Sequence, residues 1–180
     1  HLVIANNSAN NGGGIYMQSS NPTLTDVKII DNIANYGGGL SLSNSNPILE
    51  SCQILSNDAE NGGGVYLEFS SPSMIDVNVL DNIADYYGGG MYLEFSNPTL
   101  MHVDVLDNIA DYGGGISLNS SLPELISVSI SDNKANDDGG GIFLFSSDIK
   151  HPVLKKRLTH SIQNLLIFYP LIFYKSQGYN

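Results

Sequence analysis

The fold is decided by Asn32-Ile33-Ala34-Asn35-Tyr36-Gly37-Gly38-Gly39-Leu40-Ser41-Leu42, because near-copies of this stretch recur along most of the chain. Its glycine triplet has five counterparts, at Gly12 to Gly14, Gly62 to Gly64, Gly88 to Gly90, Gly113 to Gly115 and Gly139 to Gly141. Successive triplets are 25, 25, 26, 25 and 26 residues apart. A fixed period in this range predicts a solenoid, in which each unit buries its apolar face only by stacking on its neighbours.

The composition is that of a turn-rich, all-β chain. The 180 residues include 19 glycines and no tryptophan, and Asn, Asp and Ser separate short apolar runs. The length is sufficient for one domain with a continuous core. The net charge of -11 argues against nucleic acid as a partner, because phosphates are neutralised by Lys and Arg. It argues equally against an anionic membrane surface, and we expect no membrane insertion by the repeat region.

The residues after each triplet alternate between apolar and outward-facing side chains. The first apolar column contains Ile15, Leu40, Val65, Met91, Ile116 and Ile142. The second contains Met17, Leu42, Leu67, Leu93, Leu118 and Leu144. Alternation with period two predicts a short strand with one buried face in every unit.

A corner is predicted after this strand, because a proline follows it in five units. Proline fixes φ and cannot donate a hydrogen bond. The corner prolines are Pro22, Pro47, Pro72, Pro98 and Pro123. A serine two residues before the proline position recurs in all six units, and a hydroxyl that bonds local backbone at a turn explains it. A second apolar run, Leu24, Val27 and Ile29 in one unit, follows the corner.

An asparagine stands three residues after the second apolar run. The column contains Asn7, Asn32, Asn57, Asn82, Asn108 and Asn133. Amide side chains both donate and accept, so identical residues stacked about 4.8 Å apart are expected to form a ladder along the axis. An alanine such as Ala34 follows two residues later, and we expect a short turn from it to the next triplet.

The first unit is incomplete. His1 to Asn7 aligns with Asp26 to Asn32, so the chain opens in the middle of a repeat, and we expect a longer N-terminus to precede it. The single cysteine, Cys52, lies in an otherwise aliphatic column and is interpreted as a small buried hydrophobe.

The repeat unit, an aliphatic-x-x-Asn-x-Ala motif followed by Gly-Gly-Gly-aliphatic, resembles the right-handed parallel β-helix repeats of bacterial surface and secreted proteins. Within these it is similar to the passenger repeats of polymorphic outer membrane proteins, which pair Phe-x-x-Asn with Gly-Gly-Ala-aliphatic. The match covers residues 1 to 147. The chain departs from that pattern in its third glycine and in its aliphatic residues at the phenylalanine position, Ile29, Ile54, Val79, Val105 and Ile130. The resemblance implies an extracellular or bacterial cell-surface or outer-membrane location.

A leucine-rich-repeat horseshoe is the alternative fold. The pattern from Leu24 through Asn32 to Ala34 also fits that consensus at a permitted period. The rest of a leucine-rich unit, however, should supply a helical or 3₁₀ connection, where this chain has a glycine triplet, a strand and a proline corner. We therefore predict an all-β, right-handed parallel β-helix of about six coils.

Residues 148–180 break the pattern. All 18 acidic residues lie at or before Asp148, whereas most basic residues lie beyond it, at Lys150, Lys155, Lys156, Arg157 and Lys175. The apolar run from Leu165 to Tyr174 is too short to span a bilayer. Three interpretations remain: a cap over the last coil, a membrane or secretion-related segment, and an irregular C-terminus without a selected role. We favour an irregular tail that partly covers the end.

Enzymatic activity is considered because pectate lyases and polygalacturonases share the β-helix fold. Lyase chemistry on uronates needs clustered carboxylates for calcium and a Lys or Arg base, and the coil region contains only Lys28 and Lys134. Hydrolase chemistry needs two or three carboxylates at a set separation. The carboxylates here recur as columns rather than as one cluster, so we lean against an enzyme.

One acidic column gives a calcium hypothesis. Asp81, Asp107 and Asp132 stand at equivalent positions, as does Asp31, with Ser56 interrupting the column. Like charges stacked about 5 Å apart repel each other, and a bound Ca²⁺ would relieve the repulsion. The alternative is a solvated acidic face.

The tetrapeptide Tyr-Leu-Glu-Phe occurs on two neighbouring units and suggests a sugar-binding face. Stacked exposed aromatic residues beside carboxylates could hold a sugar chain, and the residues concerned are Tyr16, Tyr66, Glu68, Tyr92 and Glu94. Cross-strand stabilisation of the sheet is the alternative explanation. His102 is interpreted as a surface residue that points outward from a strand, without a partner at metal-ligand spacing.

The predicted function is therefore structural or adhesive. We expect a β-helix segment of a secreted or cell-surface protein, presenting a repetitive face to a polysaccharide or to another surface protein. A polysaccharide lyase or hydrolase of the same fold is the alternative, with its catalytic residues in coils outside this sequence. No catalytic residue is predicted within it.

Overall fold

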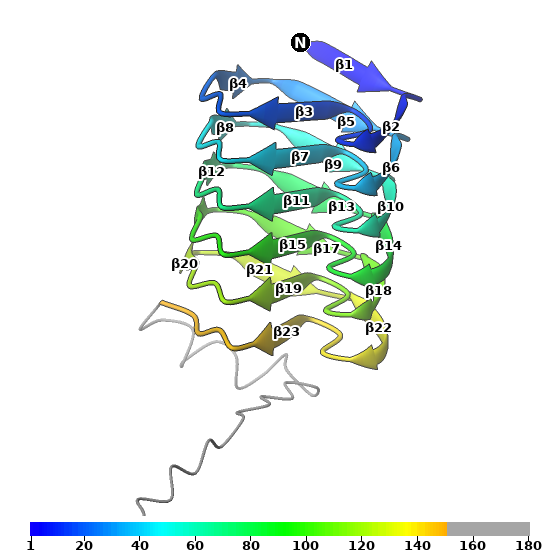
Figure 1. The fold of residues 1–180 in the computed structure, drawn as a ribbon, viewed down its shortest axis with the longest axis vertical. Helices are drawn as coiled ribbons and strands as arrows, with labels where there is room; N and C mark the ends of the chain where they lie inside the picture. The colour runs from blue at the N-terminus through cyan, green and yellow to red at the C-terminus, as the bar shows by residue number, and fades with distance from the viewer. Residues whose placement is uncertain (151–180) are drawn as a thin grey trace, which may run out of the picture.

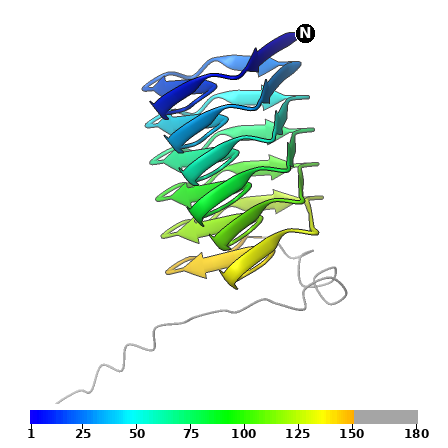
Figure 2. The same ribbon diagram turned by 90° about the vertical axis from the view of Figure 1, so that its right-hand side faces the viewer.

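The structure is a computed structural model that describes residues 1–150. Strands alternate with tight turns throughout this range, and no helix occurs in it. Each circuit of the chain adds one strand to each of four parallel sheets, so the molecule is a stack of coils (Figures 1 and 2). The predicted all-β parallel solenoid of about six coils is confirmed.

Sheets A and B have six strands each and lie on adjacent sides of the stack. Sheet A contains β1 (Leu2–Ala5), β5 (Val27–Ile30), β9 (Gln53–Leu55), β13 (Asn78–Leu80), β17 (Asp104–Leu106) and β21 (Ser129–Ser131). Sheet B contains β2 (Ser8–Asn11), β6 (Ile33–Tyr36), β10 (Asp58–Asn61), β14 (Ile83–Tyr87), β18 (Ile109–Tyr112) and β22 (Lys134–Asp138).

The other two sheets complete each coil. Sheet C contains β3 (Ile15–Gln18), β7 (Leu40–Ser43), β11 (Val65–Glu68), β15 (Met91–Glu94), β19 (Ile116–Asn119) and β23 (Ile142–Phe145). Sheet D contains β4 (Thr23–Thr25), β8 (Ile48–Glu50), β12 (Ser73–Ile75), β16 (Thr99–Met101) and β20 (Glu124–Ile126).

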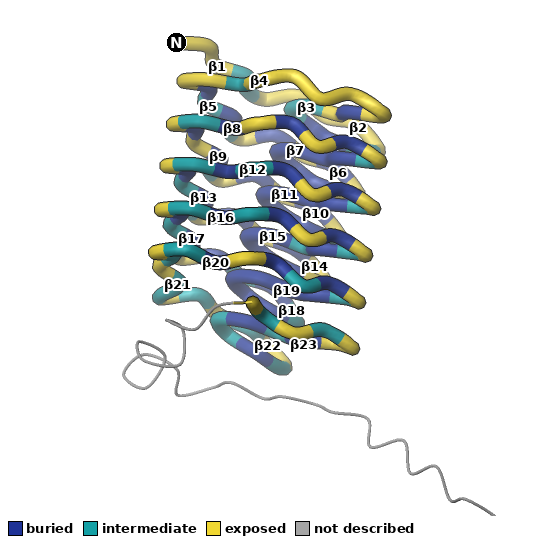
Figure 3. The backbone as a smooth tube through the Cα atoms, turned by 90° about the vertical axis from the view of Figure 1, so that its left-hand side faces the viewer, coloured by how far each residue is buried: buried dark blue, intermediate teal, exposed yellow. Residues whose placement is uncertain are grey.

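Equivalent residues of successive coils lie over one another. Leu67 pairs with Leu42 on one side and with Leu93 on the other, in parallel register. The horseshoe alternative is wrong, because a leucine-rich repeat would place a helical connection opposite sheet A. In the described range, the strands of sheet C and turns lie there, and there is no helix. Burial alternates along each coil in Figure 3.

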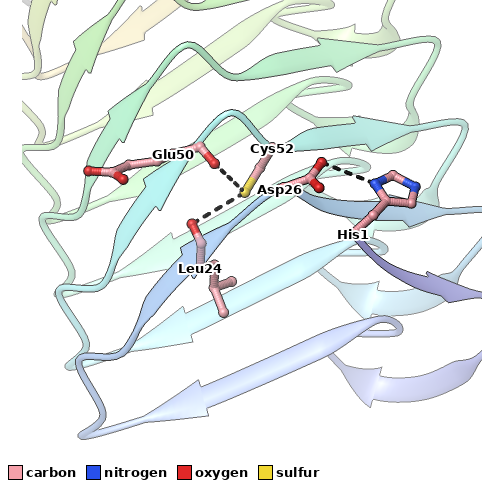
Figure 4. Close-up of polar contacts among 5 residues, drawn as sticks. All are labelled: His1, Leu24, Asp26, Glu50 and Cys52. Carbon is pink, nitrogen blue, oxygen red and sulfur yellow. Dashed lines mark hydrogen bonds and ion pairs between the residues drawn. The ribbon is translucent and has the colours of Figure 1, made fainter.

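The core is one continuous column of aliphatic side chains from sheets A, C and D. Ile29, Leu42 and Leu49 represent the three sheets and are fully buried. Cys52 lies in this column, 1% exposed, as predicted. Its thiol contacts the carbonyl oxygens of Leu24 and Glu50 (Figure 4), and burial raises the pKa of the thiol.

Two details of the coil differ from the sequence analysis. The stretch from Ile33 to Tyr36 is a strand of sheet B, whereas a short turn was expected there. The second apolar run is two strands, because Asp26 adopts a left-handed φ of 54° between β4 and β5. Sheet B was missed because its only inward residue is a small alanine, which gives a weak hydrophobic alternation.

The predicted asparagine ladder is present along all six coils. Each side-chain amide donates to the Oδ1 of the next asparagine in the ladder, at 2.9–3.0 Å. The same Oδ1 atoms accept the backbone N–H of the preceding asparagine. A second donation reaches a sheet A carbonyl of the preceding coil, as from Asn82 to Ile54 at 3.0 Å. Asn32, Asn82 and Asn108 are completely buried, and the ladder satisfies them.

A serine ladder runs along the corner between sheets C and D. The backbone N–H of each serine donates to the hydroxyl of the next, at 3.0 Å, from Ser20 through Ser45, Ser70, Ser96 and Ser121 to Ser147. Each hydroxyl donates to the carbonyl two residues earlier, as predicted for a local turn. The ladder between coils adds an interaction that the sequence analysis had not identified.

The glycine triplets form the corner between sheets B and C. The first glycine of each triplet is left-handed, as at Gly37 with a φ of 66°. The second and third glycines permit close contact between coils, as shown by the hydrogen bond from the Gly39 N–H to the Gly63 carbonyl at 3.2 Å. Both properties require glycine, so the triplet is explained by geometry.

The coil pattern continues to the end of the described range. Ile149 packs against the core, and the Lys150 N–H donates to the Pro123 carbonyl at 3.1 Å. The predictions for the tail fall almost entirely on residues 151–180, which lie outside the described residues.

Candidate functional site

Six aromatic rings, three from one column of sheet B and three from one column of sheet C, cover the glycine corner. They form a continuous series of contacts that we call the aromatic strip: Tyr36, Tyr66, Tyr92, Tyr87, Tyr112 and Phe143. Neighbouring ring centroids in this order are 5.2, 5.5, 5.4, 5.3 and 5.4 Å apart. These separations are typical of favourable aromatic contacts.

The strip is continuous because its rings come from both sides of the triplet. The column just before the triplets supplies Tyr36, Tyr87 and Tyr112, and the column after them supplies Tyr66, Tyr92 and Phe143. Where one column has a ring, the other usually has a small or polar residue: the Tyr36 coil has Ser41, and the Tyr66 coil has Asn61. Of these six rings, only Tyr66 and Tyr92 were among the predicted site residues, so four rings were missed.

Tyr66 is buried, contrary to the expectation of an exposed ring. Only 8% of the residue is exposed, since the rings of Tyr36 and Tyr92 lie against it. Its hydroxyl donates to Glu94 Oε2 at 2.7 Å. Burial is the main cause of a strongly raised pKa for Tyr66, and the hydrogen bond to the Glu94 carboxylate raises it further. Burial also raises the pKa of Tyr92.

Glu68 and Glu94 are direct neighbours on adjacent strands of sheet C. Both are partly buried and held by hydrogen bonds. The Ser43 hydroxyl donates to Glu68 Oε2 at 3.1 Å, while Tyr66 donates to Glu94. The structure thus brings four predicted site residues together, namely Tyr66, Tyr92 and the two glutamates.

The comparison with protein families agrees with this architecture. A family model described as the right-handed β-helix region matches residues 1–154. The chain belongs to the right-handed β-helix family. No curated protein matches the chain. A solved structure of trypsin-treated QnrB1, described as a plasmid-mediated fluoroquinolone resistance protein, is 13% identical and covers 89% of this chain and 98% of its own, with a TM-score of 0.18.

Tyr16 lies on the first coil of this β-helix and stands apart from the strip. It is 45% exposed, and its partner on the next coil is Ser41 rather than another aromatic residue. Within residues 1–150 no ring contact involves Tyr16. Of the predicted sugar-binding residues, it is therefore the one that the structure leaves separate.

The aspartates of the calcium hypothesis occupy a turn of the β-helix. Asp81, Asp107 and Asp132 are exposed and left-handed, with φ of 55–57°, between sheets A and B. Asp tolerates this conformation better than most residues, which accounts for the column. The part of the chain that the structure describes contains no group of three or more His, Cys, Asp or Glu arranged to hold a metal ion.

His102 lies at the surface, as predicted, but in a turn rather than in a strand. The residue is exposed but lies in the left-handed turn between β16 and β17, with φ of 50°. Its Nδ1 is 3.3 Å from Asp76 Oδ1 on the preceding coil. His1 and Asp26 form a similar pair at 3.0 Å (Figure 4).

In residues 1–150 there is no helix long and apolar enough to cross a bilayer.

The tyrosine burial predicts how stability responds to alkaline pH. Unfolded tyrosine ionises near pH ~10, whereas the raised pKa of Tyr66 keeps its proton in the folded state. This contribution to stability is fully present below about pH 10 and is lost as the pH rises further. We expect Tyr66→Phe to reduce the alkaline loss of melting temperature, while it costs about 1 kcal/mol at neutral pH because Glu94 loses a donor.

Thermal unfolding of both proteins between about pH 8 and pH 11 measures this effect. Tyr16→Phe is the control, because Tyr16 is exposed and should leave the pH dependence unchanged. Identical alkaline profiles for the wild type and Tyr66→Phe would contradict the assignment of the buried hydroxyl.

Proposed function

We propose that this chain is a non-enzymatic β-helix segment of a secreted or bacterial cell-surface protein, and that the face around sheet C binds glycans. The aromatic strip beside Glu68 and Glu94 is the observation that carries the proposal. Aromatic rings contact the C–H faces of sugars, and carboxylates accept hydrogen bonds from sugar hydroxyls.

The repetition of the face favours binding a polymer. Successive coils present equivalent positions about 4.8 Å apart, and the ring contacts continue across several coils. An extended chain lying along the axis would meet similar chemistry at each step. Catalysis, by contrast, requires one unique arrangement of groups.

The surface location rests on the resemblance to bacterial surface repeats together with the acidic charge of the chain. The coils carry a large excess of carboxylates, and a net charge of this size keeps a protein soluble and monomeric. The rigid stack then serves to display the binding face at a distance from its attachment.

The test is retention by polysaccharides in native affinity electrophoresis. We expect Tyr87→Asn to reduce retention at least fivefold, because Tyr87 contacts three other rings of the strip and each stacked aromatic is worth about 1 kcal/mol. Asparagine is native at this position in two other coils, at Asn11 and Asn61, so the fold should persist.

Tyr86→Asn is the matched control. Tyr86 is the neighbouring residue on β14 and is 52% exposed, but it is not part of the strip. Retention that is lost equally in both variants, or in neither, would argue against the strip as the binding face.

An assay of uronate polysaccharides for unsaturated products tests the lyase alternative, and product formation would overturn the non-enzymatic assignment.

A further inference from the structure

Two phenylalanines occupy a backbone position that disfavours them. The turn between sheets C and D has a left-handed residue in every coil, and the column contains Ser19, Asn44, Phe69, Phe95, Ser120 and Ser146, with φ of 48–50°. Left-handed geometry is an outlier for a bulky side chain and is better tolerated by asparagine. Four coils have a small polar residue here, so phenylalanine is not a requirement of the turn.

The same two side chains are also exposed. Phe69 is 54% and Phe95 48% exposed, so neither contributes much to the core. Their rings stack in parallel, with centroids 5.1 Å apart and planes 5° apart. Backbone strain and exposed apolar surface together in two adjacent coils indicate a role other than stability.

The stacked pair leaves one face of each ring uncovered. Phe69 and Phe95 cover each other, whereas the next residues of the column are the shorter Asn44 and Ser120. Each phenylalanine directly follows a glutamate, Glu68 or Glu94, and these two carboxylates are neighbours across the sheet C ladder. Two open ring faces and two carboxylates therefore lie within two adjacent coils.

Both kinds of group attract a cation. A ring face attracts positive charge through its quadrupole, and two neighbouring carboxylates repel each other unless a cation lies nearby. An anionic polymer would be repelled by the same groups and by the net charge of -11. The ring faces simultaneously accommodate the C–H surface of a sugar.

We infer that Phe69 and Phe95, with Glu68 and Glu94, form a binding surface for a glycan that carries protonated amino groups. This inference rests on the proposed glycan-binding function and narrows its ligand to amino-sugar polymers. Phe69 and Phe95 are the specificity-determining residues, and the aromatic strip supplies further contact area along the axis.

The test is calorimetric titration with three short oligosaccharides at a pH where amino groups are protonated: an oligomer of glucosamine, its fully N-acetylated counterpart and an oligogalacturonate. We expect the glucosamine oligomer to bind about tenfold more tightly than the N-acetylated one, and the uronate not to bind. The double variant Phe69→Asn/Phe95→Asn should bind the glucosamine oligomer about tenfold more weakly than the wild type.

The double variant distinguishes binding by the two phenylalanine rings from general attraction of a cation to an acidic protein. It leaves the net charge unchanged, so non-specific attraction of a cation to an acidic protein persists. Asn44 shows that asparagine fits the same turn, so the melting temperature should be unchanged or raised. A melting temperature lowered by several degrees, with glucosamine affinity intact, would show that the stack is structural and would overturn the inference.

The remaining outcomes distinguish the inference from the function on which it rests. Equal affinity for the N-acetylated oligomer or for the uronate would overturn the amino-sugar assignment but leave the glycan-binding function in place. No binding of any glycan, including polysaccharides in the electrophoretic test, would overturn both. Binding of tetralysine with the same dependence on the phenylalanines would replace the amino sugar with a basic polypeptide.

Discussion

Replacing Asn82 by alanine is expected to lower the free energy of unfolding by about 3 to 5 kcal/mol, since each buried polar group left without a partner costs about 1 to 3 kcal/mol. The Oδ1 of Asn82 accepts from the backbone and the side chain of Asn57. Its Nδ2 donates to Asn108 and to the Ile54 carbonyl. Alanine removes all four bonds in a site without solvent access.

Asn35→Ala is the matched control for this prediction. Asn35 donates to the Oδ1 of Asn10 across the same coil spacing, at 3.0 Å, but the pair is exposed. Water replaces that bond, so we expect a change below about 0.5 kcal/mol. Urea unfolding measures both variants, and similar effects for the two substitutions would show that the buried ladder does not stabilise the stack.

Gly63→Ala is expected to destabilise the protein by more than about 4 kcal/mol, or to prevent folding, because it forces backbone apart in the middle of the stack. A Cβ at Gly63 would lie 2.2 Å from the Ile83 carbonyl oxygen and 2.6 Å from that of Gly89. Neither neighbour is a flexible side chain. Relief of the clash requires separating coils that are joined by parallel ladders on all four sheets.

Gly141→Ala tests whether the effect comes from stacking. Gly141 stands at the end of the last triplet, and among the described residues the nearest atom to its Cβ would be Ile130 Cγ2 at 3.6 Å, an ordinary contact. We expect this variant to fold with a melting temperature close to that of the wild type. Circular dichroism during thermal unfolding compares the two, and a tolerated Gly63→Ala would contradict the close approach of the coils.

The columns of the coil were predictable because stacking repeats the same environment. Equivalents of Ile29, Asn32 and Leu42 recur at fixed offsets. The aliphatic residues are recognised by their alternation with period two, and the asparagine by its repeated, buried amide. Sheet B gave a weaker signal, since Ala34 is its inward residue and Ile33, on the outer face, is 56% exposed. An exposed isoleucine beside a buried alanine does not follow the usual hydrophobic pattern.

The candidate site was only partly predictable, because it depends on contacts between columns. The repeated Tyr-Leu-Glu-Phe sequence identified Tyr66 and Glu94, but their burial follows from rings such as Tyr36 on the other side of the triplet. The backbone strain at Phe69 has no counterpart in residue spacing and became visible only from its φ. The phenylalanines were part of the quoted motif but were not selected as site residues.

The stacked coils satisfy each other's asparagine side chains by hydrogen bonds. The most direct test of this arrangement is the rate of hydrogen exchange of the asparagine side-chain amides, measured by NMR. The amide protons of Asn57, Asn82 and Asn108 should exchange only when the stack opens, and therefore far more slowly than those of the exposed Asn35. Equal exchange rates for the buried and the exposed asparagines would contradict the ladder and the rigid display of the binding face that depends on it.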